Sequence, residues 1–305
     1  MMNYFNLLEA RKIYVTGKNV TTFLKTKYKK KENISKIIEI VYDLQAGSYI
    51  RNFNNDYKKI ELYTSEMSKI LNEHILKKDT LLDVGSGELT TLTSILNKVN
   101  VVPKNIFAFD ISWSRLIKGK KFFKKHIRHK NLKLSIFVAD MMQIPLHTSC
   151  VDVVISSHAL EPNGKNLQDL IKELFRVVKR KLILFEPSYE INSIKGQKRM
   201  DKFEYIKGIK SVVEKLGGCV TNIIPIKNYI NKLNPTVCYI IEPPKKKSDY
   251  IKNKPIFCVP GTDFILQDKK GFKDSKDLGI VFPVLKEIPI LKSNYGILAS
   301  AKFKI

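Results

Sequence analysis

The fold is decided by the stretch LLDVGSGELT at residues 81–90. An apolar run of strand length ends there in a Gly-x-Gly turn, and a helical pattern follows over residues 90–98. Glycine allows the backbone to turn tightly and a ligand to approach the main chain closely. A dinucleotide-binding turn would have a third glycine where Thr90 stands. The stretch therefore predicts a loop for a ligand that has no pyrophosphate.

From residue 79 onward, short apolar runs alternate with helical patterns. This alternation is typical of a parallel sheet with crossover helices. One long helix is predicted over 196–216, closed by Gly217 and Gly218. We therefore expect an α/β fold with a seven-stranded, doubly wound sheet. The predicted strands are 80–84, 106–109, 134–138, 151–155, 181–185, 219–226 and 236–241.

The segments that flank this sheet have other patterns. The N-terminal part is basic and helical, with candidate helices at 34–44 and 56–77 and a glycine-containing break at 45–51. After a lysine-rich linker that begins at Pro243, strand-like runs and turn residues follow, with no long helix. The predicted parts are an N-terminal helical lid over 1–78, a ligand-binding domain over 79–243 and a small β-rich appendage over 255–305.

Acidic residues end the second and third predicted strands. Asp110 lies roughly 20 residues beyond the glycine loop, where a carboxylate can accept hydrogen bonds from both hydroxyls of a ribose. Asp140 can accept a hydrogen bond from an adenine amino group while Met141 packs on the ring. Taken singly, each acid has an alternative role as a helix or turn cap. Because parallel strands end at one edge of a sheet, we expect both acids to face one ligand.

The fourth and fifth predicted strands also end in polar residues. Ser157, His158 and Glu161 follow the fourth strand, and Glu186 and Tyr189 follow the fifth. Ligands of such sheets bind at the carboxyl ends of the strands, so these side chains are candidates for the substrate side of the site. The alternatives are a packing role for the histidine and a strand-terminating turn after the fifth strand.

In this order, the strand-end motifs resemble those of class I S-adenosylmethionine-dependent methyltransferases of the methyltransferase type 11 kind. The resemblance covers about residues 80–186. It implies a Rossmann-like fold and S-adenosylmethionine as cofactor. The family often has a further glycine where this chain has Leu89. The cofactor-binding residues that the resemblance implies are Asp83, Gly85, Ser86, Gly87, Asp110, Ile111, Asp140, Met141 and Ser157.

The resemblance also suggests a role for the break at 45–51, because N-terminal helices often cover the cofactor in this family. Tyr49 and Arg51 are candidates for contacting the methionine carboxylate. A simple interhelical turn with a core tyrosine is the alternative.

Methyl transfer from a sulfonium depends mostly on positioning, but a nitrogen or oxygen acceptor can also need a base. His158 is the first candidate for this base, with Glu161 and Glu186 behind it. Tyr189 is a candidate substrate contact. No cluster of metal-ligand type is visible in the sequence, so we expect no metal ion in the reaction.

The appendage is similar to small zinc-ribbon-derived domains through FCVPGT at 257–262, LGIVFPV at 278–284 and IPIL at 288–291. Related domains activate methyltransferases that act on RNA or proteins. Only Cys258 remains of a metal-binding set, so we expect no zinc. We expect the appendage to pack on the catalytic domain or to shape the substrate entrance.

The charge of the chain leaves the acceptor open. It has 54 Lys and Arg against 29 Asp and Glu, a net charge of +25. One interpretation is a surface for RNA or another anionic partner. The other is a composition rich in Lys, Asn and Ile with no functional meaning. We expect a small-molecule acceptor, such as a sugar or a nucleotide sugar, with an RNA methyltransferase as the alternative.

The chain has no apolar run near the roughly 20 residues that a membrane helix needs. Its first twelve residues lack a small-residue cleavage site and include Glu9, which does not fit a signal peptide. Its four cysteines are scattered, as in proteins of a reducing compartment. We therefore expect a cytoplasmic protein without membrane contact, and the sequence leaves its oligomeric state open.

Overall fold

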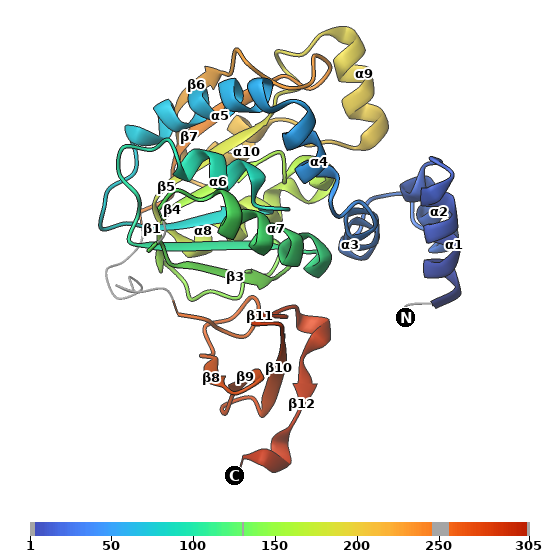
Figure 1. Ribbon diagram of the computed structural model, residues 1–305, viewed down its shortest axis with the longest axis vertical. Helices are drawn as coiled ribbons and strands as arrows, with labels where there is room; N and C mark the ends of the chain where they lie inside the picture. The colour runs from blue at the N-terminus through green and yellow to red at the C-terminus, as the bar shows by residue number, and fades with distance from the viewer. Residues whose placement is uncertain (1–3, 130, 246–255, 304–305) are drawn as a thin grey trace.

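The structure is a computed structural model that describes residues 4–129, 131–245 and 256–303. Its centre is a seven-stranded sheet of order β3-β2-β1-β4-β5-β7-β6 (Figure 1). The first five strands run parallel, and β7 runs antiparallel to both β5 and β6. The strands are β1 (Thr80–Val84), β2 (Asn105–Asp110), β3 (Leu134–Val138), β4 (Val151–Ser157), β5 (Val178–Pro187), β6 (Cys219–Pro225) and β7 (Thr236–Glu242).

Helices cover both faces of this sheet, as the predicted doubly wound fold requires. Because side chains alternate along a strand, a strand buried on both sides is apolar throughout. In β1, Leu81 packs on the face covered by α5, α6 and α7, and Leu82 on the face covered by α8 and α10. These helices are α5 (Tyr57–Asn72), α6 (Thr90–Leu96), α7 (Trp113–His126), α8 (Leu167–Val177) and α10 (Ile209–Lys215).

The predicted single helix over 196–216 is wrong, because the chain forms two helices there. They are α9 (Ile194–Phe203) and α10. Glu204 adopts a left-handed conformation after α9, and Gly208 does so before α10. The Glu204 carboxylate accepts a hydrogen bond from Lys25 Nζ at 2.8 Å, so a distant part of the chain engages the residue at the break. The glycine pair after α10 ends the helix as expected.

The N-terminal helices stand at one side of the sheet and have a small core of their own (Figure 1). They are α1 (Tyr4–Val15), α2 (Val20–Lys27) and α3 (Ser35–Leu44), and α4 (Ser48–Asn55) leads from them to α5. The predicted break is shorter than expected, because α4 already begins at Ser48. Gly47 has φ +100, which a residue with a side chain rarely adopts.

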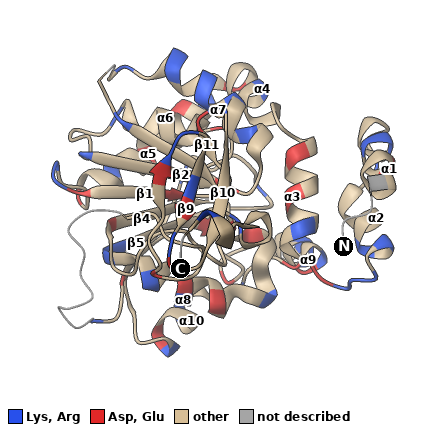
Figure 2. Cartoon of the chain, turned by 90° about the horizontal axis from the view of Figure 1, so that it is seen from below, with Lys and Arg blue, Asp and Glu red and all other residues tan. Residues whose placement is uncertain are grey.

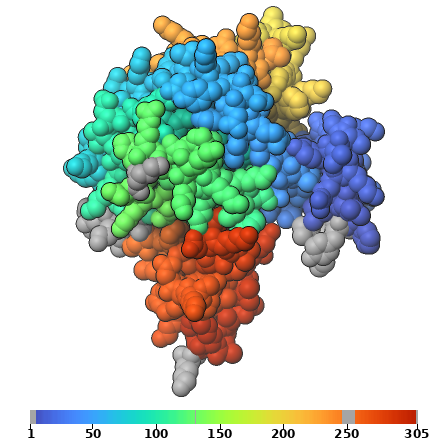
Figure 3. Space-filling view, viewed as in Figure 1, coloured from blue at the N-terminus to red at the C-terminus, as the bar shows by residue number. Residues whose placement is uncertain are grey.

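The C-terminal appendage is a small antiparallel sheet below the main one (Figures 1 and 3). Its order is β11-β10-β9-β8, with β12 paired to β10. Because it carries no long helix, it agrees with the expected β-rich pattern. The strands are β8 (Gln267–Lys269), β9 (Phe272–Ser275), β10 (Ile280–Leu285), β11 (Ile288–Pro289) and β12 (Ile297–Leu298).

The appendage docks on the edge strand β3. Leu291 N donates to Val138 O at 2.8 Å, and Ile290 forms a parallel bridge with Val138. The Phe257 ring lies edge-on to Phe107 and Phe137, with centroids 5.9 and 5.1 Å away. The appendage thereby covers a strand edge that would otherwise expose unpaired backbone groups.

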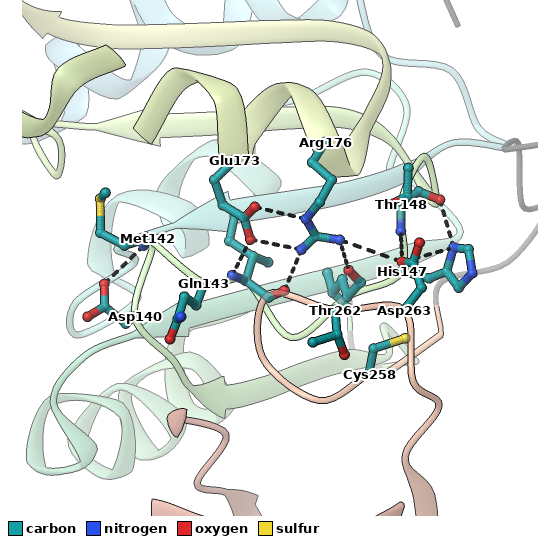
Figure 4. A network of polar contacts seen from close by, with 12 residues as sticks. Asp140, Met142, Gln143, His147, Thr148, Glu173, Arg176, Cys258, Thr262 and Asp263 are labelled. Atoms are coloured by element: carbon teal, nitrogen blue, oxygen red, sulfur yellow. Dashed lines mark hydrogen bonds and ion pairs between the residues drawn. The ribbon is translucent and has the colours of Figure 1, made fainter. Parts of the chain in front are cut away.

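A polar network closes the other side of this interface (Figure 4). Arg176 of α8 donates two hydrogen bonds of 2.8 Å to the Glu173 carboxylate, and its Nη1 lies 3.7 Å from Asp263 of the appendage. Asp263 also accepts from Thr148 N at 2.7 Å. Arg176 is thus held by a carboxylate on each side, which orients its planar guanidinium between the two parts.

Candidate functional site

The carboxyl ends of β1 to β4 surround one cavity. Parallel strands place their terminal loops together, and this brings four separate sequence motifs to one place. Tyr49, from the start of α4, also reaches this cavity. The predicted cofactor residues that line it are Asp83, Gly85, Ser86, Gly87, Asp110, Ile111, Asp140, Met141, Ser157 and Tyr49.

The loop after β1 has the backbone that its glycines predict. Gly85 has φ +68, and a Cβ there would lie 2.3 Å from the Cβ of Ala159. Gly87 has φ +53. Leu89, which stands where the family often has glycine, also adopts a left-handed φ of 57°. Its side chain is completely buried in the core between β1 and its helices, and this burial offsets the strained backbone.

Asp110 ties the second strand to the glycine loop. Its Oδ2 accepts from Gly87 N at 2.9 Å, and its Oδ1 accepts from Ser112 N at 2.9 Å. Each of these oxygens can accept a further hydrogen bond. Burial raises the pKa of this carboxyl above its usual value, although the nearby Arg115 charge opposes the rise.

Asp83 is the acid of the cavity whose burial is least offset by hydrogen bonds or opposite charges. It is 6% exposed, and the described part of the chain gives its carboxyl no hydrogen bond. Burial, with a smaller contribution from the charge of Asp110, raises the pKa of Asp83 to about 8. Such a buried carboxyl favours a cationic partner, because an opposite charge would stabilise its ionised form.

Asp140 and Met141 form the wall at the end of β3. Asp140 Oδ1 accepts from Met142 N at 3.0 Å, which fixes the turn. The Met141 methyl group lies 3.5 Å from the place where a Cβ on Gly85 would be. Met141 therefore covers the glycine loop from the third strand.

Arg115 of α7 is a cavity residue that sequence analysis missed. Its guanidinium stands 4.6 Å from the ring centre of Tyr42 and 4.7 Å from that of Tyr49. Its Nε donates to Tyr42 O at 2.9 Å. The predicted Arg51 is exposed and does not line the cavity. Sequence gave no signal for Arg115, because its contacts lie more than 60 residues away in α3 and α4.

Glu88 was also missed, although it directly follows the glycine loop. It is 1% exposed, and its two oxygens accept from Gly47 N at 2.7 Å and Ile50 N at 2.9 Å. A carboxylate at a helix N-terminus satisfies free N–H groups and the helix dipole. Glu88 therefore holds the start of α4, and with it Tyr49, against the glycine loop.

His158 lies at the rim of the cavity with a left-handed φ of 54°. Its Nδ1 contacts Glu161 Oε1, and its Nε2 lies 2.6 Å from Thr236 Oγ1. Burial alone would lower the pKa of His158, but the charge and hydrogen bond of Glu161 outweigh it and hold the pKa above its usual value. The structure thus joins two of the predicted catalytic residues into one pair.

Comparison with known proteins bears on this arrangement. Residues 82–185 match the family model described as a methyltransferase domain. These residues contain the glycine loop and the ends of β1 to β4. The chain therefore contains an S-adenosylmethionine-dependent methyltransferase domain. No curated protein matches it over its length or in part.

Solved structures share the fold of this methyltransferase. One is magnesium protoporphyrin IX methyltransferase (ChlM) from Synechocystis PCC 6803 with bound SAH, which is 14% identical to this chain and has a TM-score of 0.50. The match covers 67% of this chain and 98% of that one. A complex between the Haloferax volcanii Trm112 methyltransferase activator and a methyltransferase gives 14% identity and a TM-score of 0.51, with 66% and 96% covered. At this identity the likeness shows the fold alone.

Glu186 of the methyltransferase lies beneath the cavity and does not line it. It is completely buried, and its Oε1 accepts from Ser156 Oγ at 2.8 Å, Ala159 N at 3.1 Å and Leu160 N at 3.2 Å. Burial raises the pKa of Glu186 to about 7. Its contacts make it a support for the segment that carries His158.

Tyr189 is not brought to the site either. Its hydroxyl donates to Asp201 at 3.4 Å, and Lys207 Nζ lies 4.2 Å from its ring centre. It lines neither this cavity nor the larger one beside it. The turn after β5 directs Tyr189 toward α9 rather than toward the strand ends.

A second, larger cavity of about 850 Å³ adjoins the first. The N-terminal helices, α5 and α9 contribute to its wall, and Tyr42, Tyr49, Ser157 and His158 line both cavities. Tyr63 of α5 also lines the larger one, and its hydroxyl lies 3.2 Å from Ser157 Oγ. The two cavities of the methyltransferase therefore meet at the end of β4.

Among the residues that the structure describes, no helix has the combination of length and apolar character that a membrane span requires. The same residues contain no group of three or more His, Cys, Asp or Glu side chains arranged to hold a metal ion.

Proposed function

We propose that this methyltransferase methylates a small molecule, such as a sugar or a nucleotide sugar, in the cavity of about 850 Å³. The single observation that supports this is the junction of the two cavities at Ser157 and His158. A cavity of this volume is in the range that encloses small ligands. An acceptor within it would face the cofactor across the end of β4.

The cofactor cavity suits S-adenosylmethionine by the chemistry of its donors and acceptors. When bound, this cofactor supplies a methyl group on a sulfonium. We assign Asp110 to the ribose hydroxyls, and Asp140 with Met141 to the adenine. The backbone of the glycine loop and Tyr49 would hold the methionine part. Asp83 would accept from the cationic ammonium, which supplies the partner that its buried carboxyl lacks.

His158 is the proposed base, with Glu161 as its orienting partner. With Nδ1–H held by Glu161, Nε2 of the neutral imidazole would exchange Thr236 Oγ1 for the acceptor and take its proton as the methyl group is transferred. Glu186 would act by fixing the backbone between His158 and Leu160. Arg51 and Tyr189 have no role in this proposal, because neither lines a cavity.

Calorimetry with S-adenosylhomocysteine tests the cofactor assignment. We expect Asp110→Ala to weaken binding by about tenfold or more, because a hydrogen-bonded carboxylate is lost. Asp169→Ala removes an exposed aspartate of α8 and is the matched control. Unchanged affinity in the Asp110 variant would overturn the assignment.

The acceptor class is tested by measuring S-adenosylhomocysteine release with a panel of sugars and nucleotide sugars, and with bulk RNA. The RNA alternative is supported by the net charge of +25. Figure 2 shows Lys and Arg on many elements of the chain rather than gathered on one. RNA binding through many phosphates would fall steeply with salt. Turnover with RNA and with no small molecule would contradict the proposal.

A further inference from the structure

Arg199 of α9 lines the larger cavity together with Lys202, Phe203 and Tyr205. The guanidinium carbon lies 5.1 Å from the ring centre of Phe203 and 5.3 Å from that of Tyr205. The two aromatic rings therefore fix the plane of the guanidinium. Arg199 also forms a side-chain hydrogen bond with Tyr205. Stacking on a ring uses only the face of the guanidinium, so the N–H groups that Tyr205 does not engage stay available in its plane.

The donors of Arg199 are not used up within the protein. Its Nη1 is buried and has no hydrogen-bond partner among the described residues. No carboxylate of those residues forms an ion pair with it. Buried donors are normally satisfied, so a buried free N–H on a cavity wall indicates a group that the cavity is built to receive.

The other charges of the cavity leave an excess of positive charge. Lys25 is neutralised by Glu204 at 2.8 Å, and Glu161 is held by His158 and by Asn234 Nδ2 at 3.0 Å. Lys18, Lys202 and Asp56 also line the wall, and none of them forms an ion pair within the described ranges. With Arg199 counted, three cationic side chains there face one carboxylate. The electrostatic potential in the space that a ligand would occupy is therefore positive.

We infer that the acceptor carries an oxyanion, a phosphoryl or a carboxylate group, and that Arg199 binds it in the larger cavity. This inference rests on the proposed small-molecule acceptor, and it specifies further that this acceptor is negatively charged. A planar guanidinium matches both groups with two parallel hydrogen bonds. The bound anion would fix the acceptor at one end, so that its nucleophilic atom faces His158 at the other.

Burial lowers the pKa of His158, and Glu161 raises it to a net value above the usual one, and the positive charge of Arg199 makes a smaller contribution that opposes the rise. The two side chains are therefore within electrostatic reach across the same cavity. An anion on Arg199 would weaken this effect, so binding of the acceptor would also adjust the base.

The inference is tested by titrating the full chain, saturated with S-adenosylhomocysteine, with inorganic pyrophosphate and separately with malonate. The two probes distinguish a phosphoryl from a carboxylate preference. We expect at least one to bind the wild type, and Arg199→Gln to weaken it by about tenfold. Arg199→Lys should retain part of the affinity, because it keeps the charge and loses the planar fork.

Lys198→Gln is the matched control, because it makes the same charge change on the adjacent, exposed residue of α9. It should leave anion binding unchanged. Equal affinity in wild type and in both Arg199 variants, or no binding of either anion to the wild type, would overturn the inference. Melting curves and S-adenosylhomocysteine affinity confirm that each variant is folded.

The outcomes separate this inference from the proposed function. If S-adenosylhomocysteine binds and neither anion does, the anion site is wrong and the methyltransferase assignment stands. If the anion binds through Arg199 but no small molecule is methylated, the acceptor class is wrong. A single-stranded RNA oligonucleotide should not displace the anion; displacement with steep salt dependence would contradict a small acceptor.

Discussion

Asp83 is a buried carboxyl whose folded-state pKa, about 8, lies far above its usual value of 3.8. The folded protein therefore binds a proton that the unfolded chain releases. The contribution to stability is fully present below about pH 4 and is lost as the pH rises through 8. In the proposed function, the same carboxyl is available to the cationic ammonium of the cofactor.

We expect Asp83→Asn to be more stable than the wild type at pH 8, by about 1 kcal/mol or more, and to show a smaller fall in the free energy of unfolding between pH 5 and 8. Urea unfolding at these two pH values measures both effects. The variant should also bind S-adenosylmethionine more weakly. Equal stability of the wild type and the Asp83→Asn variant at pH 8 would contradict the claim that ionising this buried carboxyl destabilises the folded protein.

The pair of His158 and Glu161 makes a second prediction at the same scale. Because Glu161 raises the pKa of His158, the neutral base becomes abundant only as the pH rises through that value. Methyl transfer should therefore increase with pH. Glu161→Gln removes the charge and should shift the imidazole titration to lower pH by about one unit. NMR of the ring protons follows the titration, and an unmoved midpoint would refute the pairing.

At the scale of elements, the position of helix α4 depends on the side chain of Glu88, which lies outside the helix. Glu88→Gln keeps the shape and removes the charge that faces the N-terminus of α4. We expect a loss of about 1–2 kcal/mol in unfolding free energy and weaker S-adenosylhomocysteine binding, because Tyr49 moves with α4. Thermal melts and calorimetry measure the two effects.

Glu73→Gln is the control for that change, because Glu73 is exposed at the end of α5. It should alter neither quantity. If Glu88→Gln affected stability and left cofactor binding intact, α4 would not shape the cavity.

At the scale of the whole molecule, the appendage reaches the N-terminal helices as well as β3. Lys292 Nζ lies 2.7 Å from Glu39 Oε2 of α3, and their side chains are 5% and 16% exposed. The Tyr295 hydroxyl donates to the same carboxylate at 3.3 Å. The appendage thus connects α3, which lines the proposed cofactor cavity through Ile38 and Tyr42, to the end of β3.

Lys292→Met should lower the free energy of unfolding by about 2 kcal/mol, since it leaves Glu39 with only Lys36 as a cationic partner in a partly buried place. We also expect weaker S-adenosylhomocysteine binding. Lys276→Met changes an exposed lysine of the appendage and should have neither effect. Wild-type stability and wild-type S-adenosylhomocysteine affinity of the Lys292 variant would show that the contact between Lys292 and Glu39 contributes to neither.

The sequence by itself determined the sheet and predicted most of the strand-end residues that line the first cavity. Strand-end motifs such as Asp83 to Gly87 and Asp110 are local, and the parallel topology places them together without further information. Period-two and helical patterns likewise specify which segments become strands and helices.

The tertiary structure alone decided the rest. Arg115, Glu88 and Arg199 are defined by contacts with segments distant in the sequence, and no local pattern encodes such contacts. Glu204 interrupts the predicted helix at a place where its carboxylate meets the distant Lys25. Local periodicity specifies the type of each element. Packing between elements decides which side chains come into contact, and such contacts form the wall of the larger cavity.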